Sequence, residues 1–532
     1  MFSTIAKLRW QVKAIIGAIV VGGIIYAVSG TEPGTAGQAT HALGAPAGSD
    51  GGFFGRIADA VGGDSGPDLN VCINTWGGFA GAQWFNGGFE PSPESRFTKE
   101  YGISVRFEKQ DVFDTSRAAF ANGQCDLVWG TVDSYPTEAE SLQASQARSP
   151  FQVDWSRGGD AIVAVRGINS VNDLKGRSIG VAFGTPSHSL LLWLLNSANI
   201  STKEVKIVQM KDAIDVATAF KAGQLDAGVV WSPDDEDCVK AVAGSKVVVS
   251  TKQATDIIAD HLLVKHDTIV NKKAALVALY KGWMKGNVEV ATNQRAFDEA
   301  VQITAAGYGM PPEFMALAIR NVRLTTHGDN KNFYGLTAGY SGVKAEELYT
   351  RTGMLYQEQG FIGGFPSWRA VVDTAIITAA DAELGTAATQ KAENATTFAA
   401  PTPAIARAEA ISAKPVTVSF PVNGWTLDDV DKDVIDKAVL PLAKQFRSSY
   451  IRIEGNTDST GAIAANVKLS ALRAASVADY LEAQHSFPRE RFVTQGNGPG
   501  KPACDELYTT NIAACRAQNR RTEFQVLAEA GQ

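Results

Sequence analysis

The sequence contains few of the residues that build metal centres and disulfide scaffolds. It has five Cys and six His among 532 residues, and the Cys are scattered without a CxxC pair. Such spacing predicts neither a zinc site nor a cystine framework. Basic residues are not in excess, since the formal net charge is -7, and this gives no reason to expect nucleic acid as a partner. We therefore expect no metal, no other cofactor and no nucleic acid.

Length and composition indicate several globular domains. A chain of 532 residues is too long for one ordinary domain, and about three units are expected. The hydrophobic fraction of 45% and the charged fraction of 20% are normal for globular domains with ample cores.

The N-terminal residues indicate a membrane-targeting segment. Residues 14–30 carry no charge, and residues 1–13 carry no acid but three basic residues, Lys7, Arg9 and Lys13. The positive flank predicts a cytoplasmic N-terminus with the rest of the chain translocated. The apolar run is at the lower length limit for a membrane span, and the small residues Ala27 and Ser29 leave cleavage as a signal peptide open. We expect an uncleaved single-pass anchor over residues 1–30.

Two stretches of low complexity divide the remainder. Residues 31–66 and 383–415 are rich in small residues and Pro, which is typical of flexible linkers. They enclose a body at residues 67–382. Strand-like segments alternate with helix-like segments in this body, and this predicts an α/β fold with parallel sheets. Strands are expected at residues 69–76, 103–110, 125–130, 178–184, 205–210 and 227–231.

Two segments of the body are similar in sequence and indicate an internal repeat. "AFANGQCDLVW" begins at Ala119 and "AFKAGQLDAGVVW" begins at Ala219. Each predicts a helix end, a Gly at its C-cap, and an Asp that leads into a buried strand. Two equivalent lobes, each a small doubly wound sheet, would explain the recurrence.

The stretch "GGDAIVAVRGINSVNDLKGRSIGVAFGTPSHSLLLWLL" at residues 158–195 carries a family resemblance. It resembles the two-lobed periplasmic solute-binding proteins of the nitrate, sulfonate, taurine and thiamine-precursor type. The resemblance implies a type II-like periplasmic-binding-protein fold, a small-molecule solute and a membrane transporter as partner.

Ligands of open α/β sheets bind beyond the carboxyl ends of the strands. The start of the helix after Gly184 offers free N–H groups and hydroxyls, which predicts either an anion cradle or ordinary N-capping. The acidic helix start at residues 232–237 fits ordinary capping or an acidic site for an amino group. The tryptophans would sandwich a ligand or pack the hinge. The candidate cleft residues are Trp76, Gly77, Asp133, Ser134, Thr185, Ser187, Trp231 and Asp234.

Catalytic motifs are missing from this region. His188, Asp260 and His261 are the candidates near the cleft, and no nucleophile–base spacing surrounds them. We expect a protein without enzymatic activity.

One strand–turn–helix segment near the C-terminus holds two opposite charges. Residues 450–455 alternate like a half-buried strand, Asp458 follows in a turn, and the apolar spacing from Asn466 predicts a helix that carries Arg473. Such a helix can fold back and bring the two charges together. The pair would then be a structural ion pair or a clamp for a zwitterion.

The surrounding motifs resemble the OmpA-like peptidoglycan-binding domain. They are "VSFPVNGWTLDD" as the opening strand, "GNTDSTG" with "LSALRAASVADYL", "VTQGNGPGKP", and "NRRTEFQV" as the closing strand. The resemblance implies an α+β domain at residues 416–532. It also implies that Asp458 and Arg473 hold the diaminopimelate of a stem peptide, that Asn466 and Arg520 line the pocket, and that Cys504 and Cys515 form a disulfide.

Two functions follow from this organisation. In the first, a receptor anchored in the inner membrane and on peptidoglycan presents a periplasmic domain that binds a small anionic or zwitterionic solute for transport or sensing. In the second, the body no longer binds solute, and the protein is a structural tether of an envelope assembly.

Overall fold

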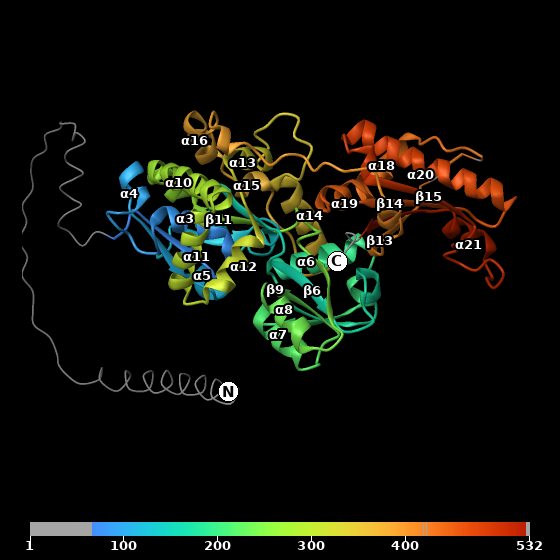
Figure 1. The fold of residues 1–532 in the computed structure, drawn as a ribbon, viewed down its shortest axis with the longest axis horizontal. Helices are drawn as coiled ribbons and strands as arrows, with labels where there is room; N and C mark the ends of the chain where they lie inside the picture. Colours follow the sequence, from blue (N-terminus) through green and yellow to red (C-terminus); the bar gives the residue numbers. More distant parts are fainter. Residues whose placement is uncertain (1–65, 419, 422, 528–532) are drawn as a thin grey trace, which may run out of the picture. The chain divides into compact units, whose positions relative to one another are not determined.

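Three β-sheets organise the part of the chain that the computed structural model describes, residues 66–418, 420–421 and 423–527 (Figure 1). The first two sheets belong to the predicted two-lobed body, and the third belongs to the C-terminal domain. The predicted anchor, and all but one residue of the first linker, lie outside the described residues. Among the described helices, none has the length and apolar character needed to cross a bilayer.

The first lobe is built on a mixed sheet with the order β12-β5-β11-β3-β1-β2, in which β4 also pairs with β11. β1 is parallel to β2 and β3, whereas β11 runs antiparallel to β3, β4 and β5. The strands are β1 (Leu69–Ile73), β2 (Val105–Lys109), β3 (Leu127–Thr131), β4 (Ala147–Arg148), β5 (Gln152–Ser156), β11 (Ala259–Lys265) and β12 (Val322–Leu324).

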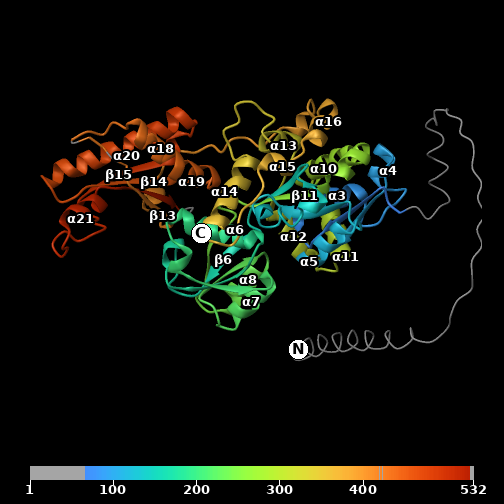
Figure 2. The same ribbon diagram turned by 180° about the vertical axis from the view of Figure 1, so that it is seen from behind.

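The second lobe has a five-stranded sheet with the order β10-β6-β9-β7-β8. β7 is parallel to β8 and β9, and β6 is antiparallel to β9 and β10. α7 and α8 lie side by side next to this sheet (Figure 2). The elements are β6 (Asp160–Ala164), β7 (Ser178–Ala182), β8 (Lys206–Met210), β9 (Ala227–Trp231), β10 (Lys246–Ser250), α6 (Pro186–Ser197), α7 (Ala213–Lys221) and α8 (Asp234–Ala241).

The prediction of parallel sheets is therefore correct only for three strands at one side of each sheet, β3, β1 and β2 in the first lobe and β9, β7 and β8 in the second. The chain passes from the first sheet to the second between β5 and β6, and it returns between β10 and β11. These crossover strands pair antiparallel to their new neighbours. Two crossings between the lobes, at residues 157–159 and 251–258, give a periplasmic-binding-protein-like α/β fold.

The two similar segments form equivalent helix–strand junctions in the two lobes. Gly123 and Gly223 have φ of 78° and 72° after the ends of α5 (Phe113–Ala121) and α7, a conformation that favours glycine. The side chain of Asp126 accepts the backbone N–H of Asn70 at 2.9 Å, and Asp226 accepts that of Ser178 at 2.8 Å. In each lobe the Asp thus connects the start of the third parallel strand to the start of the first.

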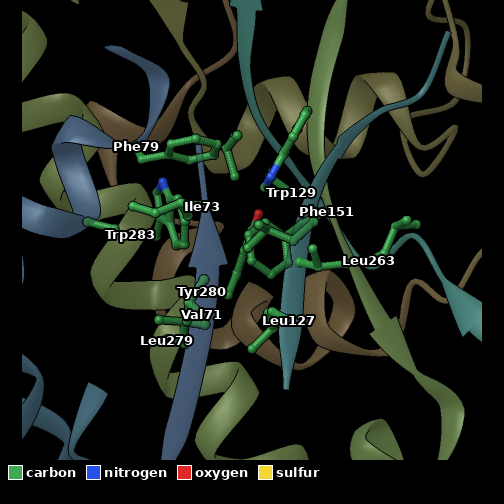
Figure 3. Packing of buried hydrophobic residues seen from close by; sticks show 14 of the residues in the cluster. Val71, Ile73, Phe79, Leu127, Trp129, Phe151, Leu263, Leu279, Tyr280 and Trp283 are labelled. Carbon is green, nitrogen blue, oxygen red and sulfur yellow. The ribbon is translucent and has the colours of Figure 1, made fainter. Parts of the chain in front are cut away.

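Aromatic residues fill the core of the first lobe (Figure 3). Trp283 of α10 is fully buried and meets Phe79 and Phe151 edge-on, with ring centroids 6.2 and 6.0 Å apart. This geometry stabilises the helical layer against the sheet. The other helices of the body are α3 (Ala80–Asn86), α4 (Arg96–Tyr101), α5 (Phe113–Ala121), α9 (His266–Asn271), α10 (Lys273–Thr292), α11 (Gln294–Tyr308), α12 (Pro312–Arg320), α13 (His327–Phe333), α14 (Ala345–Glu358), α15 (Trp368–Val371) and α16 (Ala375–Leu384).

The C-terminal domain is a four-stranded sheet with the order β13-β16-β14-β15, and α20 packs along β14 and β15 (Figure 1). Its opening strand precedes the predicted segment, because β13 pairs with β16 over residues 410–416. The elements are β13 (Ala410–Val416), α18 (Asp429–Ala438), α19 (Leu440–Gln445), β14 (Ile451–Asn456), α20 (Ile463–His485), β15 (Phe492–Gly498), α21 (Ile512–Asn519) and β16 (Thr522–Leu527).

The segment at residues 383–415 differs from the flexible linker that its composition predicts. It ends in β13 and includes a short helix, α17 (Pro403–Arg407). The Gln390 amide is buried and donates to the carbonyl of Met284 at 3.0 Å. Glu393 pairs with Arg157 of the body and Arg447 of the C-terminal domain. These bonds to neighbouring domains offset the entropy of ordering a chain with few apolar side chains.

Candidate functional site

A small cavity lies where the ends of strands from both lobes meet. Its volume is about 20 Å³, enough for a single water-sized group. Three tryptophans and two aspartates surround it, and among the described lining residues none is Lys, Arg or His. The lining residues are Asn74, Trp76, Trp129, Thr131, Asp160, Pro186, Trp231, Ile258 and Asp260.

Of the eight predicted cleft residues, Trp76 and Trp231 line this cavity. Trp76 donates its indole N–H to Asp154 at 3.3 Å, and Trp231 donates to the hydroxyl of Ser187 at 2.9 Å. The two rings come from different lobes, a placement that allows either of the two predicted roles, holding a ligand or packing the region between the lobes.

The other six predicted residues lie near the cavity without lining it. Gly77 is buried against α12, where a Cβ atom would lie 2.3 Å from the Ala318 carbonyl oxygen. The Ser134 hydroxyl bonds that of Thr131, and Asp133 is fully buried. Asp234 is the first residue of α8, and the Ser232 hydroxyl accepts a bond from Asn321 instead of capping that helix.

At the predicted anion cradle at the start of α6, one of the two hydroxyl groups has its O–H engaged within the protein. The Thr185 hydroxyl donates to the carbonyl of Ala182 at 2.7 Å, and the Ser187 hydroxyl accepts from Trp231. Neither side chain caps the helix. The Thr185 O–H is therefore engaged within the protein, whereas Ser187 accepts a bond and keeps its own O–H as a donor beside the backbone N–H groups.

Buried carboxyl groups concentrate behind the cavity wall. Burial raises the pKa of Asp133, Asp154 and Asp160 to about 7. The pKa of Asp260 is raised well above its usual range by burial and by the neighbouring acids, Asp154 first. Asp154 and Asp260 are cross-strand partners on β5 and β11. The site can therefore bind protons near neutral pH, or receive positive charge from a ligand.

The two histidines near the cleft have structural surroundings. His188 stacks on Phe183 with ring centroids 4.5 Å apart, and burial lowers the pKa of its imidazole to about 3. His261 bonds the hydroxyl of Ser149 at 2.7 Å, and burial likewise lowers its pKa to about 3. Neutral, packed imidazoles of this kind fill the core.

Sequence reasoning missed Trp129 and Asp160, and treated Asp260 only as a catalytic candidate. A signal for the two acids exists in the internal repeat, because they also stand one hundred residues apart. Asp160 is paired with Trp231 across β6 and β9, and Asp260 is paired with Thr131 across β11 and β3. The duplication therefore places one Asp opposite the strand end in each lobe.

A second candidate site lies at the carboxyl end of β14 in the C-terminal domain. Asp458 follows this strand, and its carboxylate accepts from Arg520 at 2.6 Å and from the backbone of Thr460 at 3.0 Å. Burial opposes ionisation, but the Arg520 bond prevails and lowers the pKa of Asp458. The Asn466 amide donates to the carbonyl of Thr460 at 2.9 Å, which shapes the same loop.

Arg473 of α20 approaches this loop without an acidic partner. Its guanidinium donates to the carbonyls of Gly424 at 3.0 Å and Pro421 at 3.3 Å. Among the ion pairs of the described residues, none includes Arg473. Burial, followed by the charge of Arg520, lowers its pKa. The structural ion pair between Asp458 and Arg473 is therefore not formed, and Arg520 is the partner of Asp458 instead.

Two disulfides and one free thiol account for the cysteines. Cys504, in the loop before α21, joins Cys515 within α21, and Cys72 of β1 joins Cys125, which lies just before β3. Sequence spacing gave no pairing for the second bridge. Cys238 is free and buried. Among the described residues, no group of His, Cys, Asp and Glu side chains is arranged to hold a metal ion.

Comparisons with known proteins agree with the two kinds of domain. The OmpA family model matches residues 419–516, and the NMT1/THI5 like model matches residues 161–296. A Brucella abortus binding protein is 38% identical over 74 residues, 14% of this chain and 23% of that protein. The Escherichia coli taurine-binding periplasmic protein is 28% identical over 140 residues, 26% of this chain and 43% of that protein. Outer membrane porin F of Pseudomonas aeruginosa is 38% identical over 94 residues, 18% of this chain and 26% of that protein.

The chain thus spans less than half the length of each of these relatives. A solved structure, the periplasmic aliphatic sulphonate binding protein of Escherichia coli, aligns with a TM-score of 0.45 at 16% identity, covering 63% of this chain and 97% of that one. Residues 419–516 form an OmpA-family domain, and residues 161–296 carry the NMT1/THI5-like part of a periplasmic-binding-protein-like body.

Proposed function

We propose that this protein is a cell-envelope receptor that holds a solute-binding cleft against peptidoglycan. The OmpA-family domain suggests peptidoglycan association, and the binding-protein body suggests solute binding. The observation that carries the wall-binding role is the unpaired guanidinium of Arg473, which lies on backbone carbonyls next to the Asp458–Arg520 pair.

Charge complementarity supports a zwitterionic ligand for this site. Two guanidinium groups and one carboxylate leave one positive charge to be matched, and a ligand carboxylate would match it in bidentate geometry. Asp458 would at the same time accept an ammonium group. The end of a diaminopimelate side chain in a stem peptide carries both groups, so we assign it to Asp458, Arg473 and Arg520, with Asn466 holding the loop.

Sedimentation of the full-length protein with purified diaminopimelate-type sacculi tests this assignment. Arg473→Ala and Asp458→Ala should each weaken binding by about 1.5–3 kcal/mol, the value of a hydrogen bond to a charged group. Arg473→Lys should also bind poorly, since an ammonium lacks the fork of a guanidinium. Lys468→Ala is the matched control, because Lys468 is exposed on the same helix. Full binding by a folded Arg473→Ala variant would place the wall contact elsewhere.

The membrane part of the proposal concerns residues 1–30, outside the described residues. The basic flank and the apolar run support an inner-membrane anchor with periplasmic domains, which would bring the cleft near a membrane transporter or envelope complex. N-terminal sequencing of the mature protein distinguishes an anchor from a cleaved signal peptide. A start near Gly30 would remove the anchor.

The alternative is a structural tether whose body does not bind solute, and the small volume of the cavity favours it. Thermal melts with candidate solutes separate the two functions. A ligand at 100 times its dissociation constant adds about 2.7 kcal/mol to the free energy of unfolding. A screen of nitrate, sulfonates, phosphate, amino acids and amines in which no compound raises the Tm would support the tether.

A further inference from the structure

The cavity at the hinge has the composition of a cation site. We propose that it binds the head group of a small organic ammonium ion between Trp76, Trp129 and Trp231, with Asp160 and Asp260 as counter-charges. This inference rests on the proposed solute-binding function and names its ligand class. It differs from the small anionic or zwitterionic solute that the sequence predicts.

The first argument is the pair of equivalent acids. Asp160 starts β6 opposite Trp231, and Asp260 lies in β11 opposite Thr131. One carboxyl group thus approaches the cavity from each lobe. A cation held between them would attract both lobes at once, and this would favour the closed arrangement over an open one.

The second argument is that two buried oxygen atoms at the cavity have no hydrogen-bond donor. Asn74 and Asp260 are 8% and 7% exposed, and both line the cavity. The side-chain Oδ1 of Asn74 and the Oδ2 of Asp260 make no hydrogen bond to the described residues. A buried acceptor left without a donor costs free energy. The N–H groups of an ammonium ion would satisfy both atoms.

The third argument concerns the indole rings. Each indole N–H already has a protein acceptor: Asp154 for Trp76, the Gln110 carbonyl for Trp129 and Ser187 for Trp231. The rings therefore offer the cavity their carbon surface and not a donor for an anion. Tryptophan is the aromatic side chain that attracts cations most strongly.

The neighbouring charges also disfavour an anion. Arg117 is the guanidinium near Trp129, 5.0 Å from its ring centroid, and Glu138 neutralises it through two bonds of 2.5 and 2.9 Å. The acids Asp154 and Asp235 lie next to Asp260 and Asp160, respectively, and raise their pKa. A volume of about 20 Å³ suits a group the size of one water, such as an ammonium head.

Isothermal titration of the full-length protein at pH 7.5 tests the ligand class. The probes are ammonium, methylammonium and tetramethylammonium chloride, with sodium methanesulfonate and nitrate as anionic comparisons. At least one ammonium probe should bind and quench tryptophan fluorescence, and neither anion should bind. Protons should be released on binding, because the cation favours the ionised carboxylates.

Variants locate the binding in the cavity. Asp260→Asn and Trp231→Leu should each weaken the binding of the ammonium probe at least tenfold, and Trp231→Phe should weaken it less because a ring remains. Asp237→Asn is the control, since Asp237 is exposed on α8. If Asp260→Asn does not fold, Asp160→Asn replaces it.

The possible results test three things separately: the ligand class, the assignment to this cavity, and solute binding as a whole. Binding of methanesulfonate or nitrate without binding of any ammonium probe overturns the ligand class and leaves solute binding intact. Ammonium binding that is equal in the wild type and in folded Asp260→Asn and Trp231→Leu variants overturns the assignment to this cavity. Absence of binding for every probe, together with no rise in Tm in the wider screen, overturns solute binding as a whole.

Discussion

Replacing Asp160 with Asn should stabilise the ligand-free protein above neutral pH. Asp160 is 2% exposed, and its Oδ2 accepts one hydrogen bond, from the hydroxyl of Ser156 at 2.7 Å. The amide oxygen of Asn can accept the same bond, so the substitution removes the charge and keeps the contact. Burial is the main cause of the raised pKa, and the nearby acid Asp235 adds to it.

The size of the effect follows from the pKa. A carboxyl that titrates at 3.8 when unfolded and at about 7 when folded differs by roughly 3 pKa units, which corresponds to about 4 kcal/mol. Because the folded state holds the proton more tightly, the free energy of unfolding falls as the pH rises from about 4 to about 7. This loss of stability is complete at pH values above the pKa that the Asp160 carboxyl has in the folded state. The variant should thus match the wild type near pH 4 and exceed it by up to about 4 kcal/mol at pH 8.

Urea unfolding of the full chain, followed by circular dichroism at pH 4.5, 6 and 8, measures this difference. Asp237→Asn provides the control, because an exposed carboxylate should show little change with pH. A stability gap that is the same at pH 4.5 and pH 8, or a variant that is less stable than the wild type at pH 8, would refute the argument from buried charge. An ammonium ligand should reduce the gap, since it stabilises the ionised wild-type site alone.

Two further substitutions test packing. Gly78→Ala should destabilise the first lobe and weaken solute binding, because the added Cβ would lie 1.6 Å from the Oδ2 atom of Asp154. Thermal melts measure the effect. Gly363→Ala is the control and should be neutral, because its Cβ meets no atom within 4 Å. Arg491→Leu should lower the free energy of unfolding of the C-terminal domain by at least about 3 kcal/mol, since it removes the three hydrogen bonds that Arg491 donates to buried carbonyl oxygens. Arg489→Leu, at a partly exposed ion pair, should cost about 1 kcal/mol or less.

Local signals in the sequence determined much of the architecture. The alternating residues before Gly455 and the apolar spacing after Asn466 predicted β14 and α20, and the structure forms both. The two Gly-x-x-Asp junctions predicted equivalent helix–strand units, because a left-handed Gly and a strand-leading Asp act within a few residues of each other. These elements depend on neighbours along the chain, so one sequence suffices to find them.

Contacts between distant segments were decided only by the tertiary structure. Antiparallel pairing brought Asp160 opposite Trp231 and Asp260 next to Asp154, and no local pattern states such a register. The partner of Asp458 is Arg520, 62 positions away. The hydroxyl of Ser187, which local rules offer to an anion or to its own helix, also accepts a bond from Trp231, 44 positions along the chain. A side chain's chemistry can be predicted from its type, but the ligand it can still bind depends on which of its atoms the fold leaves without a partner.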